Sequence, residues 1–170
     1  DYVMYRIASA EEIEATFQKA MAGEVPSVAE TEGYQTYLLL HCGREYARCG
    51  WAMQLHIGAL RNNNTKMYKK LGADTGFDSI NDLCIAEKLS KFMDNLNMLD
   101  VLPKTILYTL NPKDNYVLGT MLGNFQNSDA ESKIQFGSAW WFNDNIDGMR
   151  EQMKALANLG ALGKFVGMVT

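Results

Sequence analysis

The sequence is poor in cysteine, proline and basic residues, and each shortage narrows the class of protein. The three cysteines, Cys42, Cys49 and Cys84, are odd in number and lack metal-type clustering, so we expect reduced thiols in a cytoplasmic protein. The net charge of −4 gives no electrostatic footprint for nucleic acid or an anionic membrane surface. No apolar run approaches the ~18–20 residues that span a bilayer, and the first residues lack the order of a signal peptide.

No segment rich in serine or proline interrupts the chain, and no internal repeat is visible. Hydrophobic residues make up 47% and charged residues 21% of the 170 residues, which is ordinary globular usage and allows a sizeable core. The sequence contains no P-loop, GxGxxG, GxSxG or HExxH motif. We therefore expect one globular domain without a nucleotide-binding or zinc-peptidase signature.

Residues 1–50 have the pattern of a helical segment. Ser9 and Glu12 have the spacing of a capping box, which satisfies two free N–H groups at the start of a helix. Gly23 and Pro26 interrupt the helical pattern, which resumes near Val28 and continues to about residue 50.

Residues 51–170 alternate between strand and helix patterns, which predicts an α/β fold with a parallel sheet and right-handed crossovers. The expected strands are residues 51–60, 105–110, 133–138 and 165–169. The expected helices are a turn around Met67, a helix opening at Ser79 and running to about Leu99, a helix capped by Asn111 with Pro112 at its first position, and residues 146–159 ended by a left-handed Gly160. Four strands suit either a small open sheet or half of a (β/α)₈ barrel, since a complete barrel needs ~250 residues.

The first expected strand delivers His56 and Arg61 to a loop, where chemistry sits in α/β proteins. Histidine can act as acid, base or metal ligand near neutral pH. The alternative interpretation, which the sequence supports equally, is a structural histidine with a satisfied hydrogen bond. The planar guanidinium of Arg61 suits a carboxylate or phosphate, and the alternative is a surface salt bridge.

A second candidate site follows the third expected strand, in IQFGSAWWFND. Trp140 and Trp141 are adjacent, so we expect at most one to face a ligand, such as the C–H face of a sugar, while the other packs. Asn143 and Asp144 could bind a hydroxyl group, but capping of the next helix is the favoured role.

The loop from Asp74 to Ser79 carries two carboxylates, Asp74 and Asp78, which could bind metal or act as acid and base. Because the segment contains no histidine, we interpret it as a structural or lid loop, and we assign no metal ligand in this chain.

Five segments together resemble the uronate isomerase family, also called glucuronate isomerase. They are LHIGALRNNNTKMYKKLGADTGFDSIND, LPKTILYTLNP, GNFQ, QFGSAWWFNDNIDGM and FVGMVT. The resemblance is strong over residues 51–170 and weaker over residues 1–50.

The resemblance implies a divergent TIM-type (β/α)₈ barrel of the amidohydrolase superfamily, with residues 51–170 supplying its fifth to eighth strands within one catalytic domain. It implies isomerisation of D-glucuronate to D-fructuronate and of D-galacturonate to D-tagaturonate through a cis-enediol. By family likeness His56 is catalytic, and Arg61 and Trp140 bind the substrate, a small uronate sugar. No nucleic acid or membrane partner is implied, and a homo-oligomer is a candidate assembly.

The family's H-x-H pair and its D-S-R motif are absent from this sequence. We therefore expect the chain to be a segment of a longer protein, with no cofactor site of its own and a divalent metal such as zinc as a candidate in the full-length parent. Two alternatives stay open: a noncatalytic half-barrel fragment and a related amidohydrolase-type hydrolase.

Overall fold

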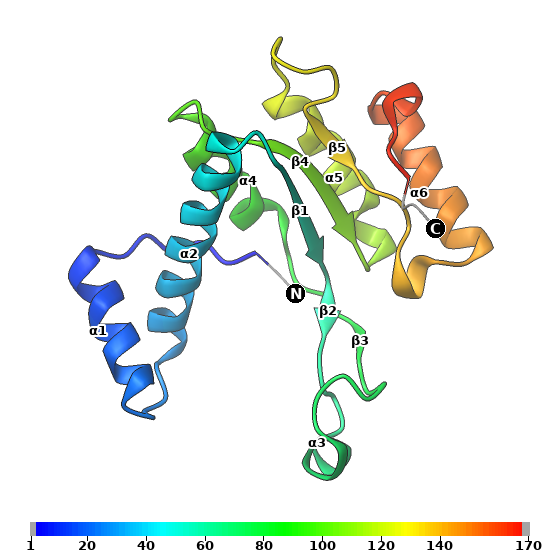
Figure 1. Ribbon diagram of the computed structural model, residues 1–170. Coiled ribbons are helices and arrows are strands. Elements are labelled where there is room, and N and C mark those ends of the chain that lie inside the picture. Colours follow the sequence, from blue (N-terminus) through cyan, green and yellow to red (C-terminus); the bar gives the residue numbers. More distant parts are fainter. Residues whose placement is uncertain (1–2, 168–170) are drawn as a thin grey trace. The chain divides into compact units, whose positions relative to one another are not determined.

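The computed structural model describes residues 3–167, which form two compact units (Figure 1). One unit contains residues 3–53 and 86–105, and the other contains residues 54–85 and 106–167. Residues 86–105 thus belong with the N-terminal helices, although they follow the boundary expected at residue 50. No helix in residues 3–167 has both the length and the apolar character needed to cross a membrane.

The first unit is helical and contains α1 (Ala10–Met21), α2 (Val28–Arg48) and α4 (Ala86–Asn97). The capping box predicted at Ser9 is confirmed, and Ser27 forms a second one at the start of α2. Helix α2 packs against α4 so closely that a Cβ on Gly43 would lie 2.6 Å from Leu96 Cδ1. The fully buried face of α4 completes this core through Leu89, Phe92, Met93 and Leu96.

The second unit is built on a parallel sheet in the order β1-β4-β5. The strands are β1 (Ala52–Ile57), β4 (Lys104–Thr109) and β5 (Ile134–Phe136), and they run in the same direction (Figure 1). Three of the four expected strands are therefore confirmed. Of the fourth, residues 165–167 form no strand, and residues 168–170 lie outside the described part of the chain.

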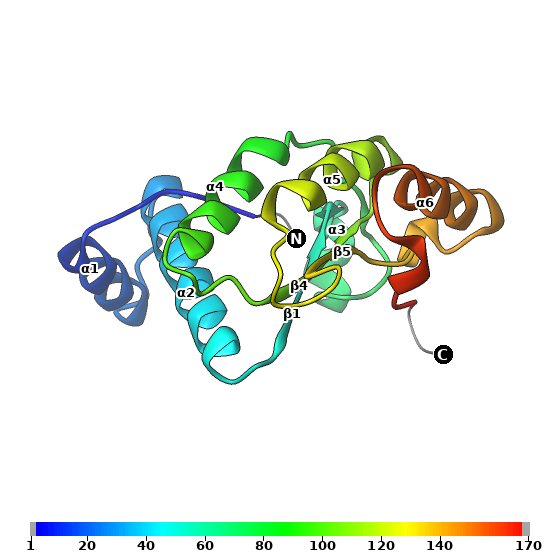
Figure 2. The same ribbon diagram turned by 90° about the horizontal axis from the view of Figure 1, so that it is seen from above.

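Helices α5 (Asn115–Leu122) and α6 (Ile146–Leu159) lie side by side in this unit, and α5 packs on β5 (Figure 2). The helices follow the sequence prediction, since Asn111 caps the short 3-10 turn Pro112–Asp114 that leads into α5. Side chains alternate across the strands. Leu107 and Phe136 are fully buried, and Tyr108, the next residue along β4, is also buried and stacks on His56.

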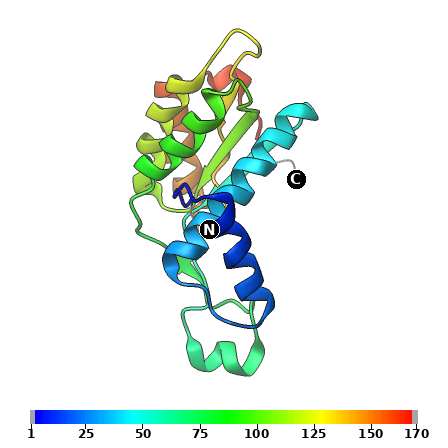
Figure 3. The ribbon, with the colours of Figure 1, turned by 90° about the vertical axis from the view of Figure 1, so that its left-hand side faces the viewer.

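The strand expected over residues 51–60 breaks at Gly58. Its φ of +108° is accessible mainly to glycine, and a Cβ there would lie 3.2 Å from Leu110 Cβ. Beyond this break, β2 (Ala59–Leu60) leaves the main sheet and pairs antiparallel with β3 (Ser79–Ile80). The segment between them carries α3 (Thr65–Leu71), which lies at the tip of the excursion (Figure 3).

Two predicted helix boundaries are wrong. Ser79 does not open a helix, because it pairs with Leu60 in the β2–β3 ladder and its hydroxyl accepts a hydrogen bond from Asn63; α4 begins only at Ala86. Gly160 does end α6, but in an extended conformation with φ −142°, so it does not adopt the left-handed conformation that we expected.

Candidate functional site

His56 lies near the end of β1, and its imidazole contacts two aromatic rings. The ring of Tyr108 stacks on it with centroids 4.2 Å apart and planes 5° apart. The indole of Trp140 meets it edge to face, with a centroid distance of 4.8 Å and an interplanar angle of 74°. The predicted residues His56 and Trp140, which are distant in the sequence, are thus brought into direct contact.

The electrostatics of this cluster favour neutral rings. Partial burial disfavours the charged imidazolium and lowers the pKa of His56. Burial likewise raises the pKa of the Tyr108 hydroxyl, which stays protonated and donates a hydrogen bond to Gln54 Oε1 at 3.0 Å. A neutral imidazole can accept a proton, so His56 has the protonation state that a general base requires.

Arg61 follows β2 and is held by the loop that comes back through β3. Its Nη1 donates to Asp78 Oδ2 at 3.0 Å and lies 3.5 Å from Asp74 Oδ1. The Asp78 side chain is 6% exposed and the Asp74 side chain 83% exposed, so Asp78 is the ordered partner. The backbone N–H of Asn62 donates to Asp78 Oδ1, and this bond, with a further contribution from Arg61, holds the pKa of Asp78 below its usual value.

Trp140 and Trp141 belong to one aromatic cluster. Trp140 is half-buried against His56, while the indole of Trp141 stacks on Phe142 at 4.8 Å and lies beneath the Arg61 guanidinium. Trp141 also has a φ of +53°, a strained conformation for a bulky residue. The two rings are 5.7 Å apart, so they connect the surroundings of His56 to those of Arg61.

The capping role expected for Asn143 and Asp144 is wrong. Asn143 is buried, and its Nδ2 donates to the backbone carbonyl oxygens of Thr109 and Leu110 at the end of β4. Asn145 caps α6 instead, accepting the backbone N–H of Gly148 at 2.9 Å. Asn143 therefore ties the loop that carries the tryptophans to the strand that carries Tyr108.

Sequence reasoning missed Tyr108 and Gly137. Tyr108 lies near the end of β4, as His56 does on β1, so the rule that chemistry gathers at strand ends could have found it. Gly137 follows β5, and a glycine at a strand end is a sign of close approach by another group. A Cβ on Gly137 would lie 2.3 Å from Tyr108 Cε1, so only glycine leaves room for the ring.

The described residues do not fit a metal site. Residues 3–167 contain no group of three or more histidine, cysteine, aspartate or glutamate side chains placed to hold an ion. Asp74 and Asp78, the carboxylates considered from the sequence, are instead directed at Arg61.

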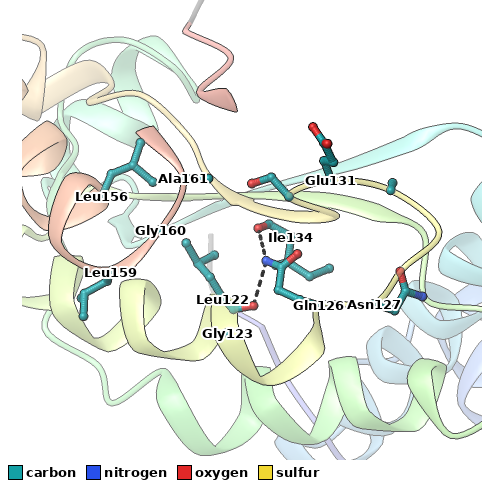
Figure 4. A pocket seen from close by; sticks show the side chains of 12 residues that line it. Leu122, Gly123, Gln126, Asn127, Glu131, Ile134, Leu156, Leu159, Gly160 and Ala161 are labelled. Carbon is teal, nitrogen blue, oxygen red and sulfur yellow. Dashed lines mark hydrogen bonds between the residues drawn. The ribbon is translucent and has the colours of Figure 1, made fainter. Parts of the chain in front are cut away.

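A cavity of about 320 Å³ lies elsewhere in the same unit. It is an open pocket lined by the C-terminal ends of α5 and α6 and the loop before β5 (Figure 4). The side-chain amide of Gln126 bridges the carbonyl oxygens of Leu122 and Ile134 at its wall. The cavity shares no residue with the cluster around His56 and Arg61.

The sequences of two uronate isomerases match the whole chain. The uronate isomerase of Caldanaerobacter subterraneus subsp. tengcongensis is 55% identical over 170 residues, and that of Clostridium acetobutylicum is 56% identical. These alignments cover 100% of this chain and 36% of either relative. The chain therefore spans little more than a third of the length of these proteins.

Solved structures agree with the sequence comparison. The crystal structure of uronate isomerase from Thermotoga maritima matches with a TM-score of 0.86 and 33% identity, covering 100% of this chain and 36% of that one. Glucuronate isomerase from Caulobacter crescentus matches in fold, with a TM-score of 0.81 at 23% identity over 98% of this chain and 33% of that one. The sequence model of the glucuronate isomerase family extends over residues 1–170, and this chain therefore belongs to that family.

Proposed function

We propose that the polypeptide carrying this chain is a uronate isomerase that converts D-glucuronate to D-fructuronate and D-galacturonate to D-tagaturonate. The family match over residues 1–170 carries this proposal. The grouping of a neutral histidine, an arginine and an indole in one unit supports it, because a uronate offers a transferable proton, a carboxylate and an apolar sugar face.

The reaction requires a proton to leave C2 of the aldose and to arrive at C1 of the ketose through a cis-enediol. We assign His56 to proton handling or hydrogen bonding at this stage, since its lowered pKa keeps the imidazole neutral. We assign Arg61 to the substrate carboxylate, since a guanidinium binds that group with two parallel hydrogen bonds. Trp140 would form a wall beside the sugar ring.

The chain would supply later strands of a (β/α)₈ barrel of the amidohydrolase superfamily. The parallel order β1-β4-β5 and the packing of α5 on β5 are consistent with a barrel segment. A divalent metal such as zinc, if the parent uses one, would take its ligands from residues outside those described here, and none of the roles above depends on it. We propose a cytoplasmic protein whose partner is the uronate itself, with a homo-oligomer as a candidate assembly.

The test is an assay of ketose formation from both uronates, with the intact mass of the source polypeptide determined in parallel. We expect activity and a mass well above 19.1 kDa. Arg61→Ala should lower kcat/KM by at least about 100-fold, the effect expected when a buried or bidentate charge partner is lost. Arg150→Ala, which removes an exposed arginine of α6, is the matched control and should leave kcat/KM unchanged.

Absence of ketose from both sugars would refute the isomerase assignment, and release of a hydrolysis product would favour the related hydrolase. A polypeptide of 19.1 kDa without activity would favour the noncatalytic fragment.

A further inference from the structure

The contacts of the His56 side chain are with aromatic rings. Within residues 3–167 its imidazole makes ring contacts with Tyr108 and Trp140, and the structure shows no hydrogen bond from a described residue to either ring nitrogen. A catalytic imidazole normally owes its orientation to a hydrogen bond on one nitrogen. Here the Tyr108 ring, stacked nearly parallel to the imidazole at 4.2 Å, is in a position to supply that orientation.

Tyr108 is itself immobilised from two sides. It is 4% exposed, and its hydroxyl donates to Gln54 Oε1, a side chain of β1 two residues before His56. The ring lies against the backbone of Gly137, where a Cβ would approach Cε1, Cδ1 and Cζ to 2.3–2.6 Å. Strand β1 thus carries His56, β4 carries Tyr108, and Gly137, directly after β5, leaves space for the Tyr108 ring.

We propose that Tyr108 is the positioning residue of His56, fixing the plane of the imidazole and covering one of its faces, and that Gly137 is required because it leaves room for the Tyr108 ring. The function of this arrangement in isomerisation rests on the proposed function above. A base must lie within hydrogen-bonding reach of the proton that it removes, and small misplacements cost large factors in rate. The stacked ring shields one face of an otherwise exposed imidazole, which agrees with the lowered pKa of His56.

Three substitutions in the full-length polypeptide separate the parts of this proposal. Tyr108→Phe keeps the stacked ring and removes the bond to Gln54, whereas Tyr108→Leu removes the planar ring. Gly137→Ala keeps Tyr108 but forces its ring to move. Gly123→Ala is the matched control, because a Cβ at Gly123 would meet no atom within 4 Å.

The first readout is independent of isomerase activity. Diethyl pyrocarbonate modifies neutral imidazole, so its rate at His56 against pH, followed by peptide mass spectrometry, reports the pKa of that side chain. We expect the midpoint for His56 to rise in Tyr108→Leu and Gly137→Ala and to stay near the wild-type position in Tyr108→Phe and Gly123→Ala. His41, an exposed residue of α2, is the internal control and should behave alike in all variants.

The second readout is the pH profile of kcat/KM for D-glucuronate. Tyr108→Leu and Gly137→Ala should lower the maximum by about 10-fold or more and move its acidic limb to higher pH, whereas Tyr108→Phe should lose less than about 3-fold. A wild-type modification profile at His56 in both Tyr108→Leu and Gly137→Ala would overturn the positioning role. If the wild-type polypeptide has no isomerase activity but Tyr108→Leu and Gly137→Ala show the expected changes at His56, the proposed function is overturned. The positioning of His56 by Tyr108 is then still supported.

Discussion

The guanidinium of Arg61 lies over the indole of Trp141, with Cζ 4.8 Å from the ring centroid. Trp141 holds this position at the cost of a left-handed backbone, with φ +53°. The same guanidinium donates to Asp78, so a carboxylate and an aromatic face both contact it. This geometry holds the Arg61 guanidinium in place, as the proposed role in binding the substrate carboxylate would require.

Replacing Trp141 by leucine should weaken substrate binding. An exposed cation–π contact contributes about 0.5–1 kcal/mol, so KM for D-glucuronate should rise about 2- to 5-fold while kcat stays within about 2-fold. Steady-state kinetics measure both. Trp51→Leu, at a tryptophan that is 63% exposed, should leave KM unchanged, and an equal rise in both variants would contradict the role of Trp141.

Asp78→Asn should raise KM more than Asp74→Asn. Asp78 binds Arg61 at 3.0 Å and also accepts the Asn62 N–H, whereas Asp74 is 3.5 Å from the guanidinium and largely exposed. Loss of the ordered partner removes the hydrogen bond on Arg61 Nη1, while loss of an exposed carboxylate changes little. The comparison needs KM values for the two variants in the same buffer, and the reverse order would show that Asp74 is the effective partner.

Acid should destabilise the wild type more than Asp78→Asn. The folded-state pKa of Asp78 lies below its ordinary value of 3.8, because the Asn62 N–H and Arg61 bind the ionised carboxylate. Its stabilising effect is therefore complete above the ordinary pKa and is lost as the pH falls through the lower folded-state pKa. Tm measured from about pH 5 to about pH 2 should fall more steeply in the wild type. Parallel curves would mean that Asp78 does not stabilise the fold.

Asn143→Ala should destabilise the protein by about 1–3 kcal/mol, the cost of leaving buried carbonyl oxygens without their donor. The amide donates to Thr109 and Leu110 carbonyl oxygens, and the side chain is buried. Urea unfolding measures the change. Asn158→Ala, which removes an exposed amide bonded to the Tyr116 hydroxyl, should cost less than about 0.5 kcal/mol. Equal losses would argue against a special role for Asn143.

Gly58→Ala should cost about 1–3 kcal/mol, because an L-residue is strained at φ +108° and the new Cβ would press on Leu110. Gly163→Ala, whose Cβ would meet no atom within 4 Å, is the control and should be close to neutral. Urea unfolding of the two variants decides the matter. A neutral Gly58→Ala would mean that the break between β1 and β2 tolerates other conformations.

Features set by neighbouring residues were predictable from the sequence. The capping box of Ser9 and Glu12 and the Asn111–Pro112 turn depend on side chains within three residues, so their spacing identifies them. The end of α2 near Gly50 and the span of α6 follow in the same way from helical periodicity.

Features set by distant residues were not predictable. Ser79 has the local chemistry of an N-cap, but its pairing with Leu60 takes precedence over that preference. Asn143 likewise has the local chemistry of a helix cap, but its amide instead binds the carbonyl oxygens at the end of β4, which are distant in the sequence. The stack of Tyr108 on His56 depends on the register between β1 and β4, which no local pattern encodes.

The turn at Gly58 places His56 in one sheet and Arg61 directly after a strand of another, although they are only five residues apart in the chain. His56 is fixed to the three-stranded sheet, whereas Arg61 is fixed to the small β2–β3 ladder that carries α3. Substitutions in residues 62–78 therefore act first on Arg61, and they reach His56 only through the contacts of Trp141 and Trp140. Under the proposed function, the residue assigned to the substrate carboxylate and the residue assigned to the proton are thus carried by two different sheets.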